Sequence, residues 1–506
     1  WLEIDFKSGK NPHLYIYCNN KWELNNDYEN LKRLISDDFK NKYIDYRTEL
    51  STQLLKDPEP NNNISLNNSI GAIVNILDFI TLNKYIDDLI KLSIQYFRSN
   101  IFEIYLDDND KLIGVKNGVI DFTGQSPLFR EGKPEDYISK CTKNEYNEEL
   151  DWEDENVKTC MKWFKQIFID DDLVEYYLSL SSSFLKGTNT NKVFMVFSGN
   201  GNNSKSMLKI LYEESLGDYA YTFPTTILTG KRTGSGSATP DTAGAEGARI
   251  CFLQEPDGSD TFNEGMLKEL SGGDKMYVRA LYGKAKNIPI KFSLILMCND
   301  IPMINNPGKA LKNRLRILPF LSEWIEDAPE SEEEQFKQRK FKINKLFRYE
   351  INNLTEAFLW ILVQKYNEYK CELSKEPQIV TDKTKEYWED VDFYQQYINN
   401  YLINDKDSNL TFEELQSDFT LWCKDLKRKV PKAHILKKIF IEKIGKLNKE
   451  NGIESWKGLR IKILSNCHLG MGHLEILVRR NLREAHIIFV QGMFQKGSMG
   501  CLGLKQ

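Results

Sequence analysis

A short stretch of the chain, 199–206, combines glycines, a lysine and serines at a spacing that can bind phosphate. Backbone N–H groups in such a loop, added to the positive end of the following helix, form an anion site. Lys205 would reach the β- and γ-phosphates of a nucleotide, and the Ser206 hydroxyl would hold Mg²⁺. A Gly/Asn-rich surface turn is the simpler alternative. The residues predicted to bind the nucleotide are Gly199, Asn200, Gly201, Asn202, Asn203, Ser204, Lys205 and Ser206.

The loop departs from the pattern G-x-x-x-x-G-K-[ST] at one position, where Ser204 replaces the second glycine. Glycine adopts left-handed backbone angles without strain, whereas serine adopts them at a cost. The substitution is tolerable if Ser204 already belongs to the first turn of the helix, because right-handed angles cost serine nothing.

Polar residues follow further apolar, strand-like runs downstream of the loop. Glu255 follows "ARICFLQ" and could bind the metal or polarise the attacking water, while the preceding Gln254 cannot ionise. Asn299 follows "KFSLILMC" and could position water at the γ-phosphate. Arg314 and Arg316 lie in "NRLRILPF", where one could stabilise charge at a neighbouring subunit's nucleotide. Side chains two residues apart on a strand point to the same face, so one of these arginines could act on the nucleotide and the other could support it.

The elements around these residues follow an α/β pattern. Apolar runs alternate with helical segments over 191–325, which predicts a sheet covered by helices. Helical spacing over 152–186 leads into the loop, and "KLIGVKNGVIDF" predicts two strands around an Asn-Gly turn. The stretch "EDAPESEEEQFKQRKFK" predicts an exposed charged connection. Helical spacing returns in 343–369, 387–402, 412–426 and 435–444, which suits a helical or winged-helix module.

Composition excludes several classes of protein. The 506 residues favour two to four domains at about 150 residues each, and 41% hydrophobic with 28% charged residues is typical of a globular protein. We find no sustained apolar run of about 20 residues, so no membrane partner is expected. Nine scattered cysteines without a CxxC pair favour a reducing compartment, so we expect a cytoplasmic rather than a secreted protein. The start at Trp1 suggests a fragment or processed product.

The order of "GNGNNSKS", "LQEP", "LKELSGGDKMYVRALYG", "LILMCND" and "NRLRILPF" resembles the helicase core of the poxvirus-type primase-helicase family. This family belongs to superfamily 3 and has relatives in large DNA viruses, phages and plasmids. "GVKNGVIDF" resembles its N-terminal helicase-associated domain, and "ESWKGLRIKI" the end of its winged-helix module. We therefore expect an N-terminal α+β helicase-associated domain in 1–150, an AAA+-like P-loop ATPase core in 151–330, a helical and winged-helix domain in 331–463, and an unassigned tail in 464–506.

The resemblance implies an ATP-dependent DNA helicase that uses ATP and Mg²⁺ and translocates on single-stranded DNA as a homohexamer. The resemblance also implies a role in replication of a viral or mobile genome, with replication proteins as partners and a primase domain upstream. It implies a location in a viral factory or the host cytoplasm. "RALYGKAKNIPIKF" resembles the hairpin that enters the ring's channel, where Lys284 and Lys286 would grip DNA phosphates. The implied catalytic residues are Lys205, Glu255, Asn299, Arg314 and Arg316, and the Mg²⁺ ligands are Ser206 and Glu255.

Two other functions would use the same residues. A nucleotide-gated DNA-binding scaffold would hold ATP without turning it over, because Ser204 and the single acid at Glu255 would not support hydrolysis. An initiator would melt or mark an origin through its C-terminal module without processive unwinding. The rate of ATP hydrolysis distinguishes the first from a helicase, and a preference for duplex DNA distinguishes the second.

Overall fold

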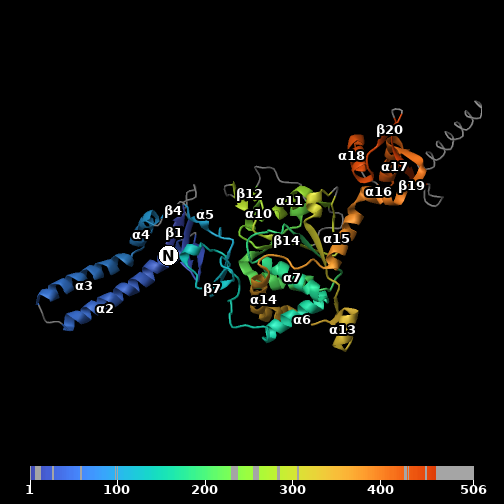
Figure 1. Cartoon of the computed structure of the whole chain (residues 1–506). Helices are drawn as coiled ribbons and strands as arrows, with labels where there is room; N and C mark the ends of the chain where they lie inside the picture. Colours follow the sequence, from blue (N-terminus) through green and yellow to red (C-terminus); the bar gives the residue numbers. More distant parts are fainter. Residues whose placement is uncertain are drawn as a thin grey trace, which may run out of the picture. The chain divides into compact units, whose positions relative to one another are not determined.

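Figure 1 shows the computed structural model of the chain. It describes residues 2–5, 13–25, 28–56, 60–96, 98–99, 101–229, 238–254, 261–281, 285–304, 307–426, 430, 432–450 and 453–462. The chain divides into two compact units, Trp1–Lys385 and Glu386–Gln506. The domain boundaries predicted near 150 and 330 both fall inside the first unit, and the predicted domains stay predictions.

The first unit begins with a small sheet and a group of helices. The sheet has the strand order β3-β2-β1-β4, and α2 packs along α3 as a long helical hairpin (Figure 1). Buried leucines and isoleucines of these helices form a separate apolar cluster with Leu14 of the sheet. The elements are β1 (Leu2–Asp5), β2 (His13–Cys18), β3 (Lys21–Asn25), α1 (Glu29–Arg33), η1 (Leu34–Phe39), α2 (Lys40–Lys56), α3 (Pro60–Ile80), α4 (Asn83–Tyr96) and β4 (Arg98–Ser99).

A second small sheet confirms the predicted Asn-Gly hairpin. β5 and β6 are antiparallel, with Val115 opposite Gly118 across the turn, and β7 adds a third strand. A Cβ on Gly118 would approach the Arg130 carbonyl to 2.4 Å, so only glycine fits at this turn. The elements here are α5 (Phe102–Tyr105), β5 (Leu112–Val115), β6 (Gly118–Asp121), β7 (Leu128–Arg130) and η2 (Pro134–Asp136).

Two buried cations connect this region to the sheet that follows. Lys291 donates to the backbone carbonyls of Asp107, at 2.9 Å, and of Asp108. Arg249 donates to the carbonyl of Leu112 at 3.0 Å. Burial lowers the pKa of both side chains. Hydrogen bonds from charged groups are stronger than those between neutral groups. These bonds therefore hold the segment 107–112 firmly against the central sheet.

The central sheet of the first unit has five parallel strands in the order β16-β8-β14-β10-β9. The predicted α/β pattern with strands at VFMVF, RICFL, SLILMC and LRILP is confirmed. Because the strands are parallel, their carboxyl ends meet at one edge, where Ser198 of β8 lies opposite Cys298 of β14. The strands are β8 (Phe194–Ser198), β9 (Ala220–Phe223), β10 (Ile250–Leu253), β14 (Ser293–Cys298) and β16 (Leu315–Pro319).

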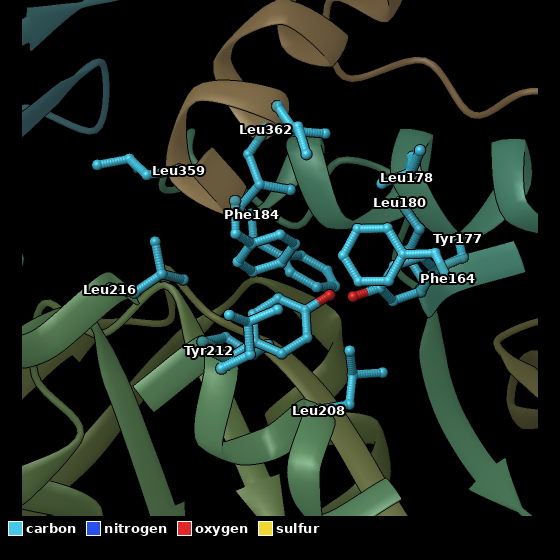
Figure 2. Close-up of a cluster of buried hydrophobic side chains, with 14 of the residues drawn as sticks. Phe164, Tyr177, Leu178, Leu180, Phe184, Leu208, Tyr212, Leu216, Leu359 and Leu362 are labelled. Atoms are coloured by element: carbon cyan, nitrogen blue, oxygen red, sulfur yellow. The ribbon is translucent and has the colours of Figure 1, made fainter. Parts of the chain in front are cut away.

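Helices pack against this sheet around a large aromatic core. Figure 2 shows Phe164, Tyr177, Phe184 and Tyr212 meeting between the helices. The Tyr212 hydroxyl lies 2.5 Å from the Ser181 hydroxyl, so the buried phenol has a polar partner. The predicted helix over 152–186 is present as two helices. The helices of this layer are α6 (Glu155–Phe168), α7 (Asp171–Ser183), α8 (Lys205–Leu216) and α14 (Phe347–Tyr369).

The charged stretch after the sheet is not the simple connection that the sequence predicted. Its residues form α13 (Glu332–Gln338) and β18 (Lys340–Lys342), and β18 pairs in parallel with β17 (Glu323–Ile325). Phe341 is buried between Lys340 and Lys342, and its ring lies 5.4 Å from that of Trp324 and 5.1 Å from that of Phe336. The charged residues are mostly exposed, as predicted, but the stretch also has secondary structure, because its aromatic residues bury apolar area.

The second unit has its own core and a small sheet. Its three strands are antiparallel in the order β19-β21-β20, and its core is rich in aromatic side chains such as Tyr397, Phe419 and Phe440. The winged-helix assignment stays a prediction. The elements are α16 (Phe393–Tyr401), β19 (Leu402–Thr411), α17 (Phe412–Asp425), α18 (Ala433–Ile444), β20 (Asn448–Glu450) and β21 (Ile453–Ile461), and α15 (Gln378–Val391) spans the boundary between the two units.

Over the described residues, no single helix is both long and apolar enough to cross a membrane, although the bent pair 63–80 and 83–96 passes on length and composition together.

Other elements of the first unit are η3 (Gly217–Tyr219), α9 (Thr226–Thr229), α10 (Pro240–Gly244), β11 (Thr261–Phe262), α11 (Glu264–Gly272), β12 (Lys275–Arg279), β13 (Ala285–Pro289), β15 (Met303–Ile304) and α12 (Lys309–Lys312).

Candidate functional site

The predicted phosphate loop connects the carboxyl end of β8 to the start of α8. Gly199 is enclosed, because a Cβ there would lie 2.4 Å from the Phe320 carbonyl oxygen. Backbone hydrogen bonds from residues after β16 hold the loop in place. The Phe320 N–H donates to the Ser198 carbonyl at 2.7 Å, and the Trp324 N–H donates to the Asn202 carbonyl at 2.8 Å. The loop therefore has a defined shape at the edge of the sheet where α/β proteins bind ligands.

Ser204 does not have the right-handed angles that would make its presence free of cost. It precedes α8 with φ of 68° and ψ of 4°, in the left-handed region that glycine favours. Asn202 also has a positive φ, of 56°. The sequence condition for tolerating serine is thus not met, because the chain must reverse sharply before the helix begins. Outside glycine and asparagine, this conformation costs about 1–2 kcal/mol.

Lys205 and Asn299, predicted separately from the sequence, lie in contact. The Lys205 side chain is buried, and its ammonium group donates to the Gly199 carbonyl and, at 3.0 Å, to the Asn299 side-chain oxygen. The two meet because β8 and β14 are parallel neighbours whose ends share one edge. In this pair the Asn299 side-chain oxygen is the acceptor, and the donor group of the same amide is its N–H₂.

A cavity of about 1070 Å³ opens beside the loop and is lined by residues 201–207, Gln254 and Asn299. Ser206 is exposed in the first turn of α8. Asn203 is buried, and its side-chain nitrogen has no hydrogen-bond partner among the described residues. A buried ammonium, an exposed hydroxyl at a helix N-terminus and an unpaired amide donor fit a polyphosphate with its Mg²⁺.

The two predicted arginines lie at the other end of the sheet from the loop. β16 runs parallel to β8, with Leu315 opposite Phe194 at the start and Pro319 opposite Ser198 at the loop end. Arg314 precedes β16, and Arg316 is its second residue. Neither side chain can therefore serve the phosphate loop of its own chain.

Different elements hold the two guanidinium groups. Arg314 donates to the Lys268 carbonyl at 2.9 Å and to the Ser271 hydroxyl at 3.4 Å, both in α11. Arg316 donates to the Glu376 carboxylate at 2.5 Å. The expectation that one arginine supports the other is not observed, because Arg314 lies outside the strand whose alternation that expectation used.

The predicted hairpin is present as β12 and β13, an antiparallel pair with Arg279 opposite Ala285 near its end. Lys286 of β13 forms an ion pair with Glu246 at 2.5 Å, and both side chains are about half exposed. Glu255 and Lys284 lie outside the described residues.

Four aromatic residues of the cavity lining were not predicted from the sequence. They are Trp163 of α6 and Trp324, Phe341 and Phe347 from the segment after the sheet. The alternation of Phe341 with flanking lysines was the signal that could have indicated its burial.

Comparison with known proteins relates the chain to viral proteins. Residues 13–169 match the family described as D5 N terminal like. Over 421 residues the chain is 31% identical to a protein of Acanthamoeba polyphaga mimivirus named "Putative helicase", an alignment that covers 82% of this chain and 43% of that protein. It is also 31% identical, over 365 residues, to another protein named as a putative helicase, from Invertebrate iridescent virus 6, covering 68% and 37% of the two chains.

The chain spans about two fifths of the length of these relatives. Among solved structures, the apo structure of the NrS-1 C terminal region matches with a TM-score of 0.39 and 14% identity, over 60% of this chain and 75% of that one. The resemblance stated from the sequence is confirmed by the sequence matches. Residues 13–169 thus match a D5 N terminal like domain, and the chain is similar to helicase-named proteins of large DNA viruses.

Proposed function

We propose that the chain is the motor part of an ATP-dependent DNA helicase that moves on single-stranded DNA during replication of a viral genome. The observation that carries the proposal is the contact between Lys205 and Asn299 above the carboxyl ends of β8 and β14, beside the cavity. This is where a phosphate loop must place its lysine and polar partner. The viral relatives named as helicases support the same function.

The chemistry would be hydrolysis of the β–γ phosphoanhydride of ATP by water. Lys205 would hold the phosphates, and its position under the loop keeps the ammonium group at the cavity wall. Ser206 and Glu255 would hold Mg²⁺, which when bound neutralises charge on the phosphates. Asn299 would orient the attacking water through its amide group, and Glu255 would polarise it.

The proposal includes a ring, a homohexamer with an AAA+-like core, in which each nucleotide lies between two subunits. The placement of Arg314 and Arg316 at the sheet end opposite the loop supports it, because these side chains could act only on another subunit's nucleotide. The upstream primase domain, the replication partners, the location in a viral factory or host cytoplasm, and the DNA contacts of Lys284 and Lys286 remain predictions from the resemblance.

The test is the steady-state rate of ATP hydrolysis with and without single-stranded DNA, for the wild type and for Lys205→Ala. We expect stimulation by DNA and a loss of about 100-fold or more in the variant, since the lysine stabilises charge that develops in the transition state. Lys116→Ala, an exposed lysine outside the cavity, serves as the matched control.

Other outcomes point to other functions. A wild-type protein that binds ATP and DNA without turnover would be a nucleotide-gated scaffold, and the strained Ser204 would be the first residue to examine. Hydrolysis accompanied by tighter binding to duplex than to single-stranded DNA would favour the origin-melting initiator.

A further inference from the structure

The cavity beside the phosphate loop has an aromatic wall that the phosphates of a nucleotide would not need. Two ring pairs form it. Trp163 and Phe347 meet edge to face with ring centroids 4.7 Å apart, and Trp324 and Phe341 lie 5.4 Å apart at an angle of 34°. Trp163 and Phe341 are buried, whereas Trp324 and Phe347 are only partly buried. The pairs therefore present ring surface to the cavity instead of closing it.

Hydrogen bonds hold this wall to the loop. The Trp324 N–H donates to the Asn202 carbonyl at 2.8 Å, so β17 is fixed against the middle of the loop. The Ser322 hydroxyl donates to the Gln166 carbonyl at 2.6 Å, which fixes the same segment against α6. The loop and the two aromatic segments thus form one site with two chemically different sides.

Two exposed ion pairs lie beside the aromatic wall, and their lysines, Lys162 and Lys345, line the cavity. Lys162 pairs with Glu332 at 2.9 Å, and Lys345 pairs with Glu326 at 2.6 Å, and all four side chains are exposed. Exposed pairs of this kind contribute little to stability. Each of these lysines is paired with an acid, so the four side chains add no net charge beside the wall, while the rings suit a flat, uncharged group.

We propose that this wall is the nucleobase subsite of the cavity, with Trp324 as its principal stacking residue and Trp163 and Phe347 beside it. The inference rests on the proposed function, because it takes the phosphates to lie on the loop. A purine is the base that fits best, since stacking on an aromatic side chain grows with the overlapping ring area. Trp324 and Phe347 thereby contact the substrate, and Trp324 determines how tightly the base is held.

Paired binding measurements test this inference. The ligands are Mg·ATP and inorganic tripolyphosphate, titrated calorimetrically into the full chain. For Trp324→Ala we expect ATP affinity to fall about tenfold or more and tripolyphosphate affinity to change less than about twofold, because only ATP has a base to stack. Trp324→Phe should recover most of the ATP affinity. Tyr349→Ala, an exposed aromatic residue of α14 outside the cavity lining, should change neither.

A second measurement on the wild type covers the case in which Trp324→Ala disturbs folding and loses both ligands. Photo-crosslinking with 8-azido-ATP should label peptides from 155–168 or 323–350, and excess ATP should prevent the labelling. Labelling confined to other segments, or equal affinities of wild type and a folded Trp324→Ala for ATP, would overturn the inference while leaving the phosphate loop intact. A wild-type chain that binds neither ATP nor tripolyphosphate would instead contradict the proposed function.

Discussion

Ser204 combines the backbone angles of a glycine with a side chain, at the point where the phosphate loop enters α8. Its neighbour Lys205 depends on this reversal, because the turn directs the ammonium group back to the Gly199 carbonyl and to Asn299. The backbone of Ser204 is therefore strained, directly beside the ammonium group that would bind phosphate. Strain of this kind persists only where the surrounding contacts over-determine the backbone.

We expect Ser204→Gly to raise the free energy of unfolding by about 1 kcal/mol, since relief of the left-handed strain exceeds the added freedom of glycine in the unfolded chain. Urea denaturation measures the change. Asn202→Gly is the matched control: φ there is 56°, but asparagine tolerates this region, so the gain should be smaller. Equal or lower stability of Ser204→Gly would show that the serine side chain makes a compensating contact.

At the scale of an element, the β12–β13 hairpin presents one polar face. Met276 and Val278 are buried, and the alternate residues Lys275, Tyr277 and Arg279 are exposed. The backbone N–H and carbonyl of Arg279 bond to Thr239, which fixes the segment before α10 to the hairpin. Glu246, which follows α10, thereby comes within reach of Lys286.

We expect Glu246→Gln to bind single-stranded DNA about threefold more tightly, since the acid would compete with DNA phosphates for Lys286 and an exposed pair is worth about 1 kcal/mol or less. Fluorescence anisotropy at several salt concentrations measures this. The slope of log K against log salt should steepen by up to about 0.7, as for one additional phosphate contact. Glu356→Gln, an exposed acid of α14, changes the net charge equally and should leave affinity unaltered. An equal gain in DNA affinity for both variants would show that the effect comes from the net charge and not from Lys286.

At the scale of the whole molecule, the two compact units have separate cores. Phe440 is fully buried in the core of the second unit, and Phe358 is fully buried in that of the first. Each core is large enough in aromatic residues to unfold as a cooperative transition of its own.

We expect Phe440→Ala to lower the unfolding temperature of one calorimetric transition and to leave the other unchanged, with a loss of about 3–5 kcal/mol in the affected unit. Phe358→Ala should shift the other transition by a similar amount. If each substitution moved both transitions together, the two units would be energetically coupled, and the division into independent cores would be wrong.

The placement of Arg314 away from the loop of its own chain leads to a prediction about assembly. Lys205→Ala and Arg314→Ala should each abolish ATP hydrolysis alone, whereas an equal mixture should recover about a quarter of the wild-type rate, because random head-to-tail interfaces then combine an intact loop with an intact arginine. The steady-state ATPase rate after mixing and reassembly measures this. The same mixture with Arg316→Ala identifies which arginine acts. No recovery with either would place the arginines in structural roles only, through α11 and Glu376.

The sequence by itself predicted the loop between β8 and α8 and the polar residues that follow the strands. Residues 199–206, Asn299 and the Asn-Gly turn of β5 and β6 were predictable because local spacing and short-range backbone geometry specify them. The resemblance to viral helicase-named proteins was also predictable, since the motifs lie in one order along the chain, and the sequence matches bear it out.

Only the tertiary structure decided which of these groups meet. Lys205 reaches Asn299 because two strands distant in sequence are parallel neighbours. Arg314 and Arg316 bond to different partners, α11 and Glu376. The left-handed angles of Ser204 and the burial of Phe341 among lysines likewise depend on what packs against them. Spacing along a chain specifies local periodicity, whereas burial and strain arise from contacts between segments that the linear pattern does not relate.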